Sequence, residues 1–168
     1  ITPADLKEVY SFAYRHALER ITNSIKARDL MTTTVYTVQR NTPLRDVAKI
    51  MAANGISGVP VVSSDMQVIG IISETDFCSS MGDHTAKSLM GVIADCLKNQ
   101  GCFAMTIREK KAEDIMTSPA VTVSPEDSLM QIKAVLKGNS INRVPVVDSQ
   151  GHLAGIISRA DIVRFAFS

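Results

Sequence analysis

Apolar residues recur at helical spacing in two stretches of the chain, NTPLRDVAKIMAANG at 41–55 and PEDSLMQIKAVLKGN at 125–139. Each stretch carries one apolar stripe, formed by Leu44, Val47, Ile50 and Met51 in the first and by Leu129, Ile132, Val135 and Leu136 in the second. The spacing predicts an amphipathic helix in each stretch. Candidate N-caps are Thr42 in the first and Asp127 or Glu126 in the second, and the pairs Asn54-Gly55 and Gly138-Asn139 are candidate stop signals.

Two short apolar runs follow each predicted helix, 59–62 with 68–72 and 144–147 with 153–157. The turn-rich stretches SSDMQ and DSQGH join the members of each pair, which predicts two hairpins. The runs are continuously apolar, so we expect burial on both faces. Shorter β-like stretches at 35–38 and 120–123 precede the helices, and a second helix is predicted to open at Ser73 and at Ser158.

The two sets of elements are copies of one unit. An offset of 85 residues aligns Asp29 with Asp114 and continues to Asp76 and Asp161 without a gap. The sequence therefore predicts an α/β (α+β) fold of two pseudo-symmetric β-α-β-β-α repeats packed as one module, since about 50 residues alone bury too little surface. The expected divisions are an N-terminal helix at 1–27, repeats at 28–78 and 113–168, and a helical insert or linker at 79–112.

Two amphipathic segments lie outside the repeat. Between residues 4 and 25 the apolar positions fall close to one helical face, which predicts a long helix that packs on the pair or mediates dimerisation. The insert contains AKSLMGVIADCLKN, whose apolar stripe is typical of core packing.

Composition narrows the class of protein. A net charge of +1 argues against nucleic acid as a partner, and no apolar run reaches the length of a membrane span. The three cysteines form no paired motif and indicate reduced thiols in a cytoplasmic protein. A first residue Ile1 suggests a fragment or a processed product whose missing part could be membrane-bound. The sequence offers no activated nucleophile, acid and base pair or metal cluster, so we expect no enzyme, catalytic residue or metal site.

The repeated junctions GIISETD and GIISRAD carry the most suggestive chemistry. Ser73-x-x-Asp76 and Ser158-x-x-Asp161 have the form of a capping box. A helix start with free N–H groups also attracts phosphate, and a carboxylate nearby can accept hydrogen bonds from two ribose hydroxyls. Capping and ligand binding are compatible.

The two junctions differ in charge. In the second copy Arg159 and Arg143 stand where the first has Glu74 and Gly58. Guanidinium groups beside a helix start favour phosphate and a carboxylate opposes it, so we expect unequal sites.

The D-[LI]-M-T openings, the [IV]-x-x-V-P-V-V strands and the G-I-I-S-x-x-D endings together resemble tandem cystathionine-β-synthase (CBS) domains. The resemblance covers about 28–77 and 113–164. It implies a regulatory module that binds an adenine nucleotide (AMP, ADP or ATP), or a related adenosyl compound such as S-adenosylmethionine, in a cleft between the repeats, with no other cofactor. It also implies a homodimer that relays a conformational change to an unknown effector, possibly a membrane protein.

The resemblance assigns site residues, with the serine on phosphate and the aspartate on ribose. The main cleft would comprise Thr34, Tyr36, Ile56, Ser57, Asn142, Arg143, Ser158, Arg159 and Asp161. A second, weaker cleft would comprise Ser73, Asp76, Pro119, Val121 and Ile141. The alternative is a dimerisation scaffold that binds no ligand and uses its Ser-x-x-Asp motifs only as caps. Neither the preferred adenosyl ligand nor the effector follows from the sequence.

Overall fold

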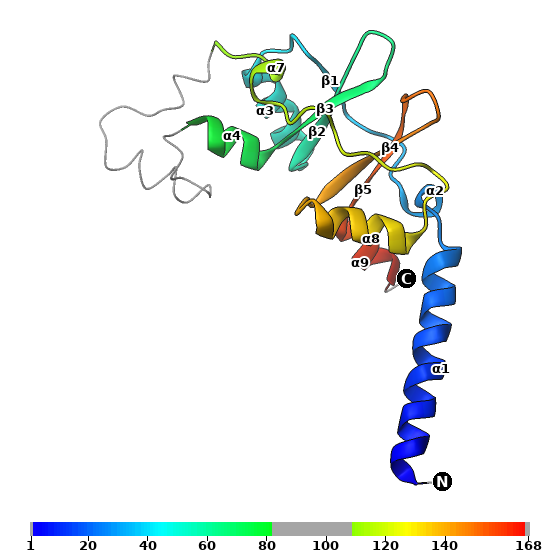
Figure 1. The fold of residues 1–168 in the computed structure, drawn as a ribbon. Coiled ribbons are helices and arrows are strands. Elements are labelled where there is room, and N and C mark those ends of the chain that lie inside the picture. The colour runs from blue at the N-terminus through cyan, green and yellow to red at the C-terminus, as the bar shows by residue number, and fades with distance from the viewer. Residues whose placement is uncertain (1, 82–108, 167–168) are drawn as a thin grey trace, which may run out of the picture. The chain divides into compact units, whose positions relative to one another are not determined.

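A computed structural model of the chain describes residues 2–81 and 109–166 (Figure 1). It forms two compact units, each built from separate stretches of sequence. Unit 1 draws on 1–33, 122–148 and 154–168, and unit 2 on 34–121 and 149–153. The helix expected around AKSLMGVIADCLKN lies outside the described residues.

Unit 2 contains the strands of the first repeat. Its elements are β1 (Val38–Gln39), α3 (Leu44–Ala53), β2 (Gly58–Val62), β3 (Val68–Ser73), α4 (Glu74–Met81) and α7 (Ala112–Ile115). The sheet order is β1-β2-β3, with β1 parallel and β3 antiparallel to β2. The predicted hairpin is therefore confirmed. Every residue of β2 is buried, as its unbroken apolar run led us to expect.

Unit 1 contains the second copy of these elements. Its elements are α1 (Pro3–Ser24), α2 (Ala27–Leu30), α8 (Leu129–Gly138), β4 (Arg143–Val147), β5 (Leu153–Ser158) and α9 (Arg159–Ala166), and only Leu153 of these is grouped with unit 2. Strands β4 and β5 pair in a sheet of their own. Val123 makes an isolated parallel bridge to Val146, where the first repeat has β1 beside β2. The described residues thus form two small sheets and seven helices, which confirms the mixed α/β fold.

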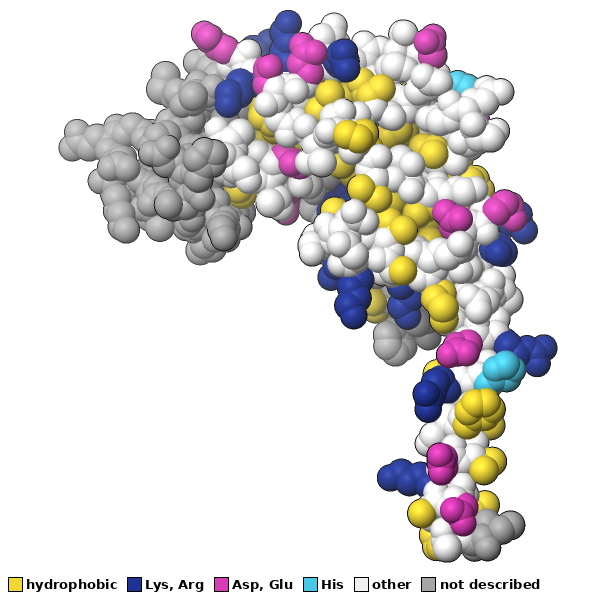
Figure 2. All heavy atoms as spheres, in the orientation of Figure 1, with side chains coloured by type: hydrophobic (Ala, Val, Ile, Leu, Met, Phe, Trp, Pro, Cys, Tyr) yellow, Lys and Arg dark blue, Asp and Glu magenta, His cyan; other side chains and the backbone are white. Residues whose placement is uncertain are grey.

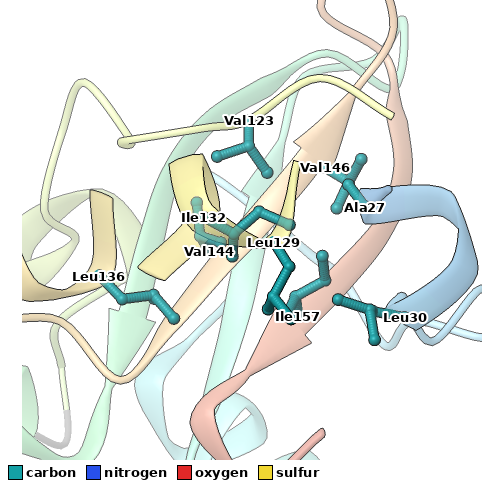
Figure 3. Close-up of a cluster of buried hydrophobic side chains, with 9 residues drawn as sticks. All are labelled: Ala27, Leu30, Val123, Leu129, Ile132, Leu136, Val144, Val146 and Ile157. Carbon is teal, nitrogen blue, oxygen red and sulfur yellow. The ribbon is translucent and has the colours of Figure 1, made fainter. Parts of the chain in front are cut away.

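Each unit has its own apolar core. In unit 1 side chains from α8, β4 and β5 meet those of α2 (Figure 3). This cluster consists of Ala27, Leu30, Val123, Leu129, Ile132, Leu136, Val144, Val146 and Ile157. The corresponding cluster of unit 2 consists of Val38, Leu44, Val47, Met51, Val59, Val61, Ile72 and Ala112. The predicted helix stripes of both repeats therefore face these cores.

The segment that opens each sequence repeat packs into the core of the other repeat. Ala27 and Leu30 lie at the start of the first repeat but belong to the core of unit 1, whereas Ala112 lies at the start of the second repeat and is fully buried in unit 2. Backbone hydrogen bonds join Thr32 to Ile156 and Thr117 to Ile71, each in both directions at 2.9 to 3.1 Å. Packing and sequence periodicity thus divide the chain differently.

The structure corrects the predicted starts of the first helix in each repeat. Thr42 and Asp127 accept hydrogen bonds from the N–H groups of Gln39 and Ser124, so both close the turn that precedes the helix. Pro43 is the N-cap of α3 and makes no side-chain capping bond. Ser128 caps α8. The predicted β-stretches before these helices are also shorter than expected, at Val38–Gln39 and a single bridge at Val123.

Candidate functional site

The Ser158-Asp161 junction forms a complete capping box at the start of α9. One carboxylate oxygen of Asp161 accepts hydrogen bonds from the Ser158 N–H at 2.8 Å and from its hydroxyl at 2.6 Å. The Asp161 N–H donates to the Ser158 hydroxyl oxygen at 3.2 Å. The other carboxylate oxygen pairs with Arg164 at 3.7 Å, and the side chain is 15% exposed. The junction therefore holds a carboxylate in one orientation, and part of the Asp161 side chain remains exposed.

The Ser73-Asp76 junction repeats the two bonds from the serine to the carboxylate at the start of α4. The Ser73 N–H and hydroxyl both donate to one oxygen of Asp76 at 2.6 Å. The other oxygen accepts a hydrogen bond from the hydroxyl of Thr117, 3.0 Å away and 41 residues on in sequence. Each carboxylate thus accepts two hydrogen bonds from its own serine, and the two carboxylates differ in the partner of the second oxygen.

Sequence reasoning missed both partners of those second oxygens. Thr117 is the last residue of the second D-[LI]-M-T opening, at 114–117. Its contact with Asp76 depends on how this opening, or entry segment, packs in unit 2. Arg164 lies three residues after Asp161, a helical spacing that the sequence does display. A charged partner at one junction and a neutral hydroxyl at the other make the two sites chemically unequal.

The remaining residues of the main predicted cleft lie in different units. Thr34 and Tyr36 are exposed on unit 2, the latter by 47%, and Ile56 and Ser57 are half-buried there. On unit 1 Arg143 is half-buried at the start of β4, and the N–H of Arg159 donates to the carbonyl of Asn142 at 2.9 Å. The structure brings Asn142 and Arg159 together with the Ser158 junction. The combination of these residues with those of unit 2 stays a prediction.

Four of the five residues of the second predicted cleft lie in one unit. Ser73, Asp76, Pro119 and Val121 all belong to unit 2, and Ser118 beside Pro119 donates to the carbonyl of Ile69 at 2.8 Å. Ile141 instead packs against the core of unit 1. Its inclusion in this cleft stays a prediction.

An apolar pocket of about 420 Å³ opens between α3 and α4 of unit 2. Its lining includes two residues of the main predicted cleft, Ile56 and Ser57, and consists of Ala48, Met51, Ala52, Gly55, Ile56, Ser57, Glu74, Phe77 and Cys78. Among the described residues of this lining, Glu74 is the only acidic one. The pocket can accept an apolar surface that carries a cation at its edge.

A second pocket of unit 2, about 520 Å³, has a more polar lining. It lies beside the end of β1 and contains Arg40, Asn41 and Glu113, with Arg40 Nε and a Glu113 oxygen 3.9 Å apart. None of the predicted ligand-binding residues lines it.

In the part of the chain that the structure describes, no three His, Cys, Asp or Glu side chains gather as a metal site would require. Cys78 is a buried thiol in this part of the chain. Of the helices in residues 2–81 and 109–166, none combines the length and the apolar character needed to cross a membrane.

The fold, the repeated junctions and the paired strands define a tandem CBS-domain pair. The family model for the CBS domain matches the chain twice, at residues 27–83 and 112–168. The chain therefore belongs to the CBS-domain family, and the family resemblance inferred from its motifs is confirmed.

The curated relatives of this chain differ in how much of their length it spans. Uncharacterized protein MJ1426 of Methanocaldococcus jannaschii is 28% identical over 149 residues, which cover 82% of this chain and 88% of the relative. The chain spans only 50% and 39% of the next two curated relatives, MJ1225 and MJ1232 of the same organism. The same module therefore occurs both nearly alone and within longer proteins.

Solved structures share the fold. The CBS domain of a CBS domain-containing membrane protein from Sphaerobacter thermophilus is 31% identical, with a TM-score of 0.70 over 93% of this chain and 96% of that one. CBSX2 of Arabidopsis thaliana in complex with AMP is 23% identical, with a TM-score of 0.65 over 85% and 96%. The CBS pair of MJ0100 in complex with 5′-methylthioadenosine and S-adenosyl-L-methionine is 23% identical, with a TM-score of 0.63 over 84% and 95%.

Proposed function

We propose that this chain is a non-catalytic regulatory module that binds an adenine nucleotide or a related adenosyl compound through its Ser-x-x-Asp junctions. The observation that carries the proposal is the geometry of Asp161. Its carboxylate is held by two hydrogen bonds from Ser158 at a helix start, while the side chain keeps 15% of its surface exposed. A carboxylate in that position suits the hydroxyls of a ribose, and the helix start suits a phosphate.

The complexes of similar proteins support the chemical class of the ligand. CBSX2 has been crystallised with AMP, and the CBS pair of MJ0100 with 5′-methylthioadenosine and S-adenosyl-L-methionine. These ligands share an adenosyl group and differ in phosphate and charge. The adenosyl group is therefore the part that we expect this chain to recognise.

Charge favours the second repeat as the stronger site. Arg159 follows Ser158 directly and is exposed, whereas the aligned residue of the first repeat is Glu74. A guanidinium group can donate two parallel hydrogen bonds to a phosphate, and a carboxylate in the same place repels it. In the first repeat Thr117 also occupies the second oxygen of Asp76 with a neutral hydrogen bond. We propose that the Asp161 site takes the nucleotide and that the Asp76 site is empty, weak or restricted to ligands with fewer phosphates.

We also propose a homodimer, supported by the contrast between equivalent helix faces. The α3–α4 pocket of unit 2 is lined mainly by apolar and small side chains with Glu74 among them. The aligned positions of α8 and α9 carry exposed cations, with Lys133, Lys137 and Arg159 in place of Ala48, Ala52 and Glu74. Opposite charges on equivalent faces favour contact between unlike faces of two copies. Light scattering at tens of micromolar tests the dimer, and a monomer would contradict it.

Regulation follows if the ligand prefers one arrangement of the module over another. Binding then shifts the population toward that arrangement, by no more than the ligand's difference in affinity between the two. The effector would be a fused domain or a bound protein, and a membrane protein is among the candidates. The relatives of which this chain spans half or less are compatible with a fused effector.

Calorimetric titration of AMP, ADP, ATP and S-adenosylmethionine into the wild-type chain tests the proposal. We expect saturable binding by at least one of the four, with a rise in melting temperature alongside. At 100 times its dissociation constant a ligand adds about 2.7 kcal/mol to the free energy of unfolding. Asp161→Ala should abolish binding, and Arg159→Glu should weaken ATP more than S-adenosylmethionine, because it removes a phosphate partner.

The matched control is Asp127→Ala. Asp127 also accepts a backbone N–H bond in unit 1, from Ser124 at 2.8 Å, but it belongs to the turn before α8 and to neither predicted cleft. It should therefore lower stability and leave ligand affinity unchanged. Ligand-free protein that shows neither heat nor a melting shift with any of the four compounds would instead support the dimerisation scaffold.

A further inference from the structure

Helix α1 is a well-formed helix without a buried residue. It runs from Pro3 to Ser24, about 33 Å, and begins with a capping box between Thr2 and Asp5. The hydrogen bonds from Thr2 keep the pKa of Asp5 below its ordinary value of 3.8. Its seven large apolar side chains are between 43% and 70% exposed, namely Leu6, Val9, Tyr10, Phe12, Tyr14, Leu18 and Ile21. Figure 2 shows hydrophobic side chains beside charged ones along this helix.

Such a helix needs a partner for its apolar face. An isolated helix of mixed composition is marginal in water, and most helices in proteins are stabilised by packing one face. The α1 stripe, which we define as Leu6, Tyr10, Ala13, Ala17 and Ile21, follows spacings of four, three, four and four residues. These spacings keep the stripe on one side of the helix, the pattern of a helix-pairing seam. Arg20 borders the stripe, where its long aliphatic stem can lie along an apolar surface.

The sizes of the side chains in the α1 stripe select the partner's direction. Two α1 helices side by side in parallel register would place Tyr10 against Tyr10 and Ala17 against Ala17. The two tyrosines would crowd each other, and the two alanines would leave a void between the helices. An antiparallel pair centred between Ala13 and Tyr14 places Tyr10 against Ala17 and Leu6 against Ile21. Large side chains then face small or medium ones along the contact, which close packing requires.

Charge selects the same direction. The first half of the helix, to Phe12, contains two acids and one base, Asp5, Glu8 and Lys7, for a net charge of −1. The second half contains two bases and one acid, Arg15, Arg20 and Glu19, for a net charge of +1 with His16 neutral. An antiparallel pair sets each half against its opposite and aligns the helix dipoles favourably.

From these observations we propose that α1 pairs with the α1 helix of a second copy of this chain, antiparallel, about a twofold axis between Ala13 and Tyr14. The contact is self-complementary, as a twofold interface between identical chains must be. The C-terminal end of α1 is joined to the rest of unit 1, because the carbonyl of Ile25 accepts a hydrogen bond from the N–H of Leu129 at 2.9 Å. The proposed contact therefore joins unit 1 of one chain to unit 1 of another. It does not require ligand binding at Asp161.

Disulfide cross-linking of mixed chains tests the direction. In a background with Cys78, Cys96 and Cys102 replaced by alanine, one full-length chain carries Tyr10→Cys and the other Ala17→Cys. In the antiparallel pair these two cysteines face each other, whereas identical positions lie seven residues, about 10 Å, apart along the axis and beyond the reach of a disulfide. We expect the mixed cross-link to dominate and both self-links to be absent. Dominant self-links would mean a parallel pair, and cross-linking no greater than that of Ser11→Cys would mean no pair; either result overturns the proposal.

A charge substitution tests the contact without cysteines. Ala17→Glu puts a carboxylate in the α1 stripe, and Ser11→Glu adds the same charge on the polar side of the helix. Sedimentation should show weaker self-association by about tenfold or more for Ala17→Glu, equal to about 1.4 kcal/mol, and no change for Ser11→Glu. Equal behaviour of the two variants would overturn the proposal. Binding of the wild-type chain to anionic phosphatidylserine vesicles that Leu6→Glu removes would also overturn it. Nucleotide titration of Ala17→Glu, expected to match wild type, keeps this test separate from the proposed function.

Discussion

Gly70 and Gly155 occupy equivalent places in β3 and β5, and each lies directly against an entry-segment methionine. A Cβ added at Gly155 would stand 2.7 Å from the sulfur of Met31 and 2.9 Å from the carbonyl oxygen of Thr32. At Gly70 the corresponding distances are 2.8 Å to Met116 and 3.1 Å to Thr117. The repeated glycine and the repeated Met-Thr pair are therefore two sides of one contact, which occurs once in each unit.

We predict that Gly155→Ala destabilises the protein by about 1 to 3 kcal/mol, because the added methyl group forces the entry segment away from the strand. Urea unfolding measures the change. Gly138→Ala is the control, since nothing lies within 4 Å of a Cβ built there and alanine is the better helix former. Equal stability of Gly155→Ala and wild type would contradict the close contact.

At the scale of elements, the two repeats begin their first helices differently. Helix α8 starts with a complete capping box in which the Ser128 hydroxyl accepts from the N–H of Gln131 at 3.3 Å and the Gln131 side chain accepts from the N–H of Ser128 at 2.7 Å. Helix α3 starts at Pro43 without a side-chain cap. Its first turn relies on the buried Leu44 and on the bond from the Leu44 N–H to the carbonyl of Lys110.

We predict that Ser128→Ala lowers the free energy of unfolding by about 1 kcal/mol, the usual value of an N-cap. Urea titration followed by circular dichroism provides the measurement. Ser124→Ala is the matched control in the preceding turn. The Ser124 hydroxyl accepts a bond of the same length, 3.3 Å, from the N–H of Glu126, but it is exposed, so the change in stability should be no more than about 0.5 kcal/mol. If both variants lost the same stability, the cap would not be the cause.

At the scale of the whole molecule, each compact unit contains strands from one repeat and the entry segment of the other. Ala27 and Leu30 complete the core of unit 1, and Ala112 is fully buried in that of unit 2. Neither repeat, cut out by its sequence boundaries, would retain its own core intact. Each unit therefore needs residues from both repeats, and the two repeats are not two successive, independent domains.

We predict that a chain starting at Thr34 loses amide protection in α8, β4 and β5 while β2 and β3 keep theirs, although the deleted residues include the start of the first repeat. The deletion removes Ala27, Leu30 and the backbone bonds of Thr32 to Ile156. Hydrogen exchange read by mass spectrometry reports both units in one experiment. Deletion of 1–24 alone removes α1 and should leave the exchange of these strands unchanged. Loss of protection first in β2 and β3 would contradict the exchanged packing.

The sequence by itself determined the repeated unit, its strands and the Ser-x-x-Asp junctions. The physical reason is that these features rest on local interactions. Apolar periodicity is read within one element, and the Ser158 and Asp161 bonds join residues only three apart. The sequence alone therefore predicted the chemistry of the junction and its membership in a CBS pair.

Only the tertiary structure decided which entry segment completes which core, and which group meets the second oxygen of Asp76. Both repeats have the same pattern of apolar positions, so periodicity assigns an entry segment equally well to its own repeat or to the other. The bond from Thr117 to Asp76 spans 41 residues, and the contact of Met31 with Gly155 spans far more. Contacts at such separations are set by how the whole chain packs, which no local pattern encodes.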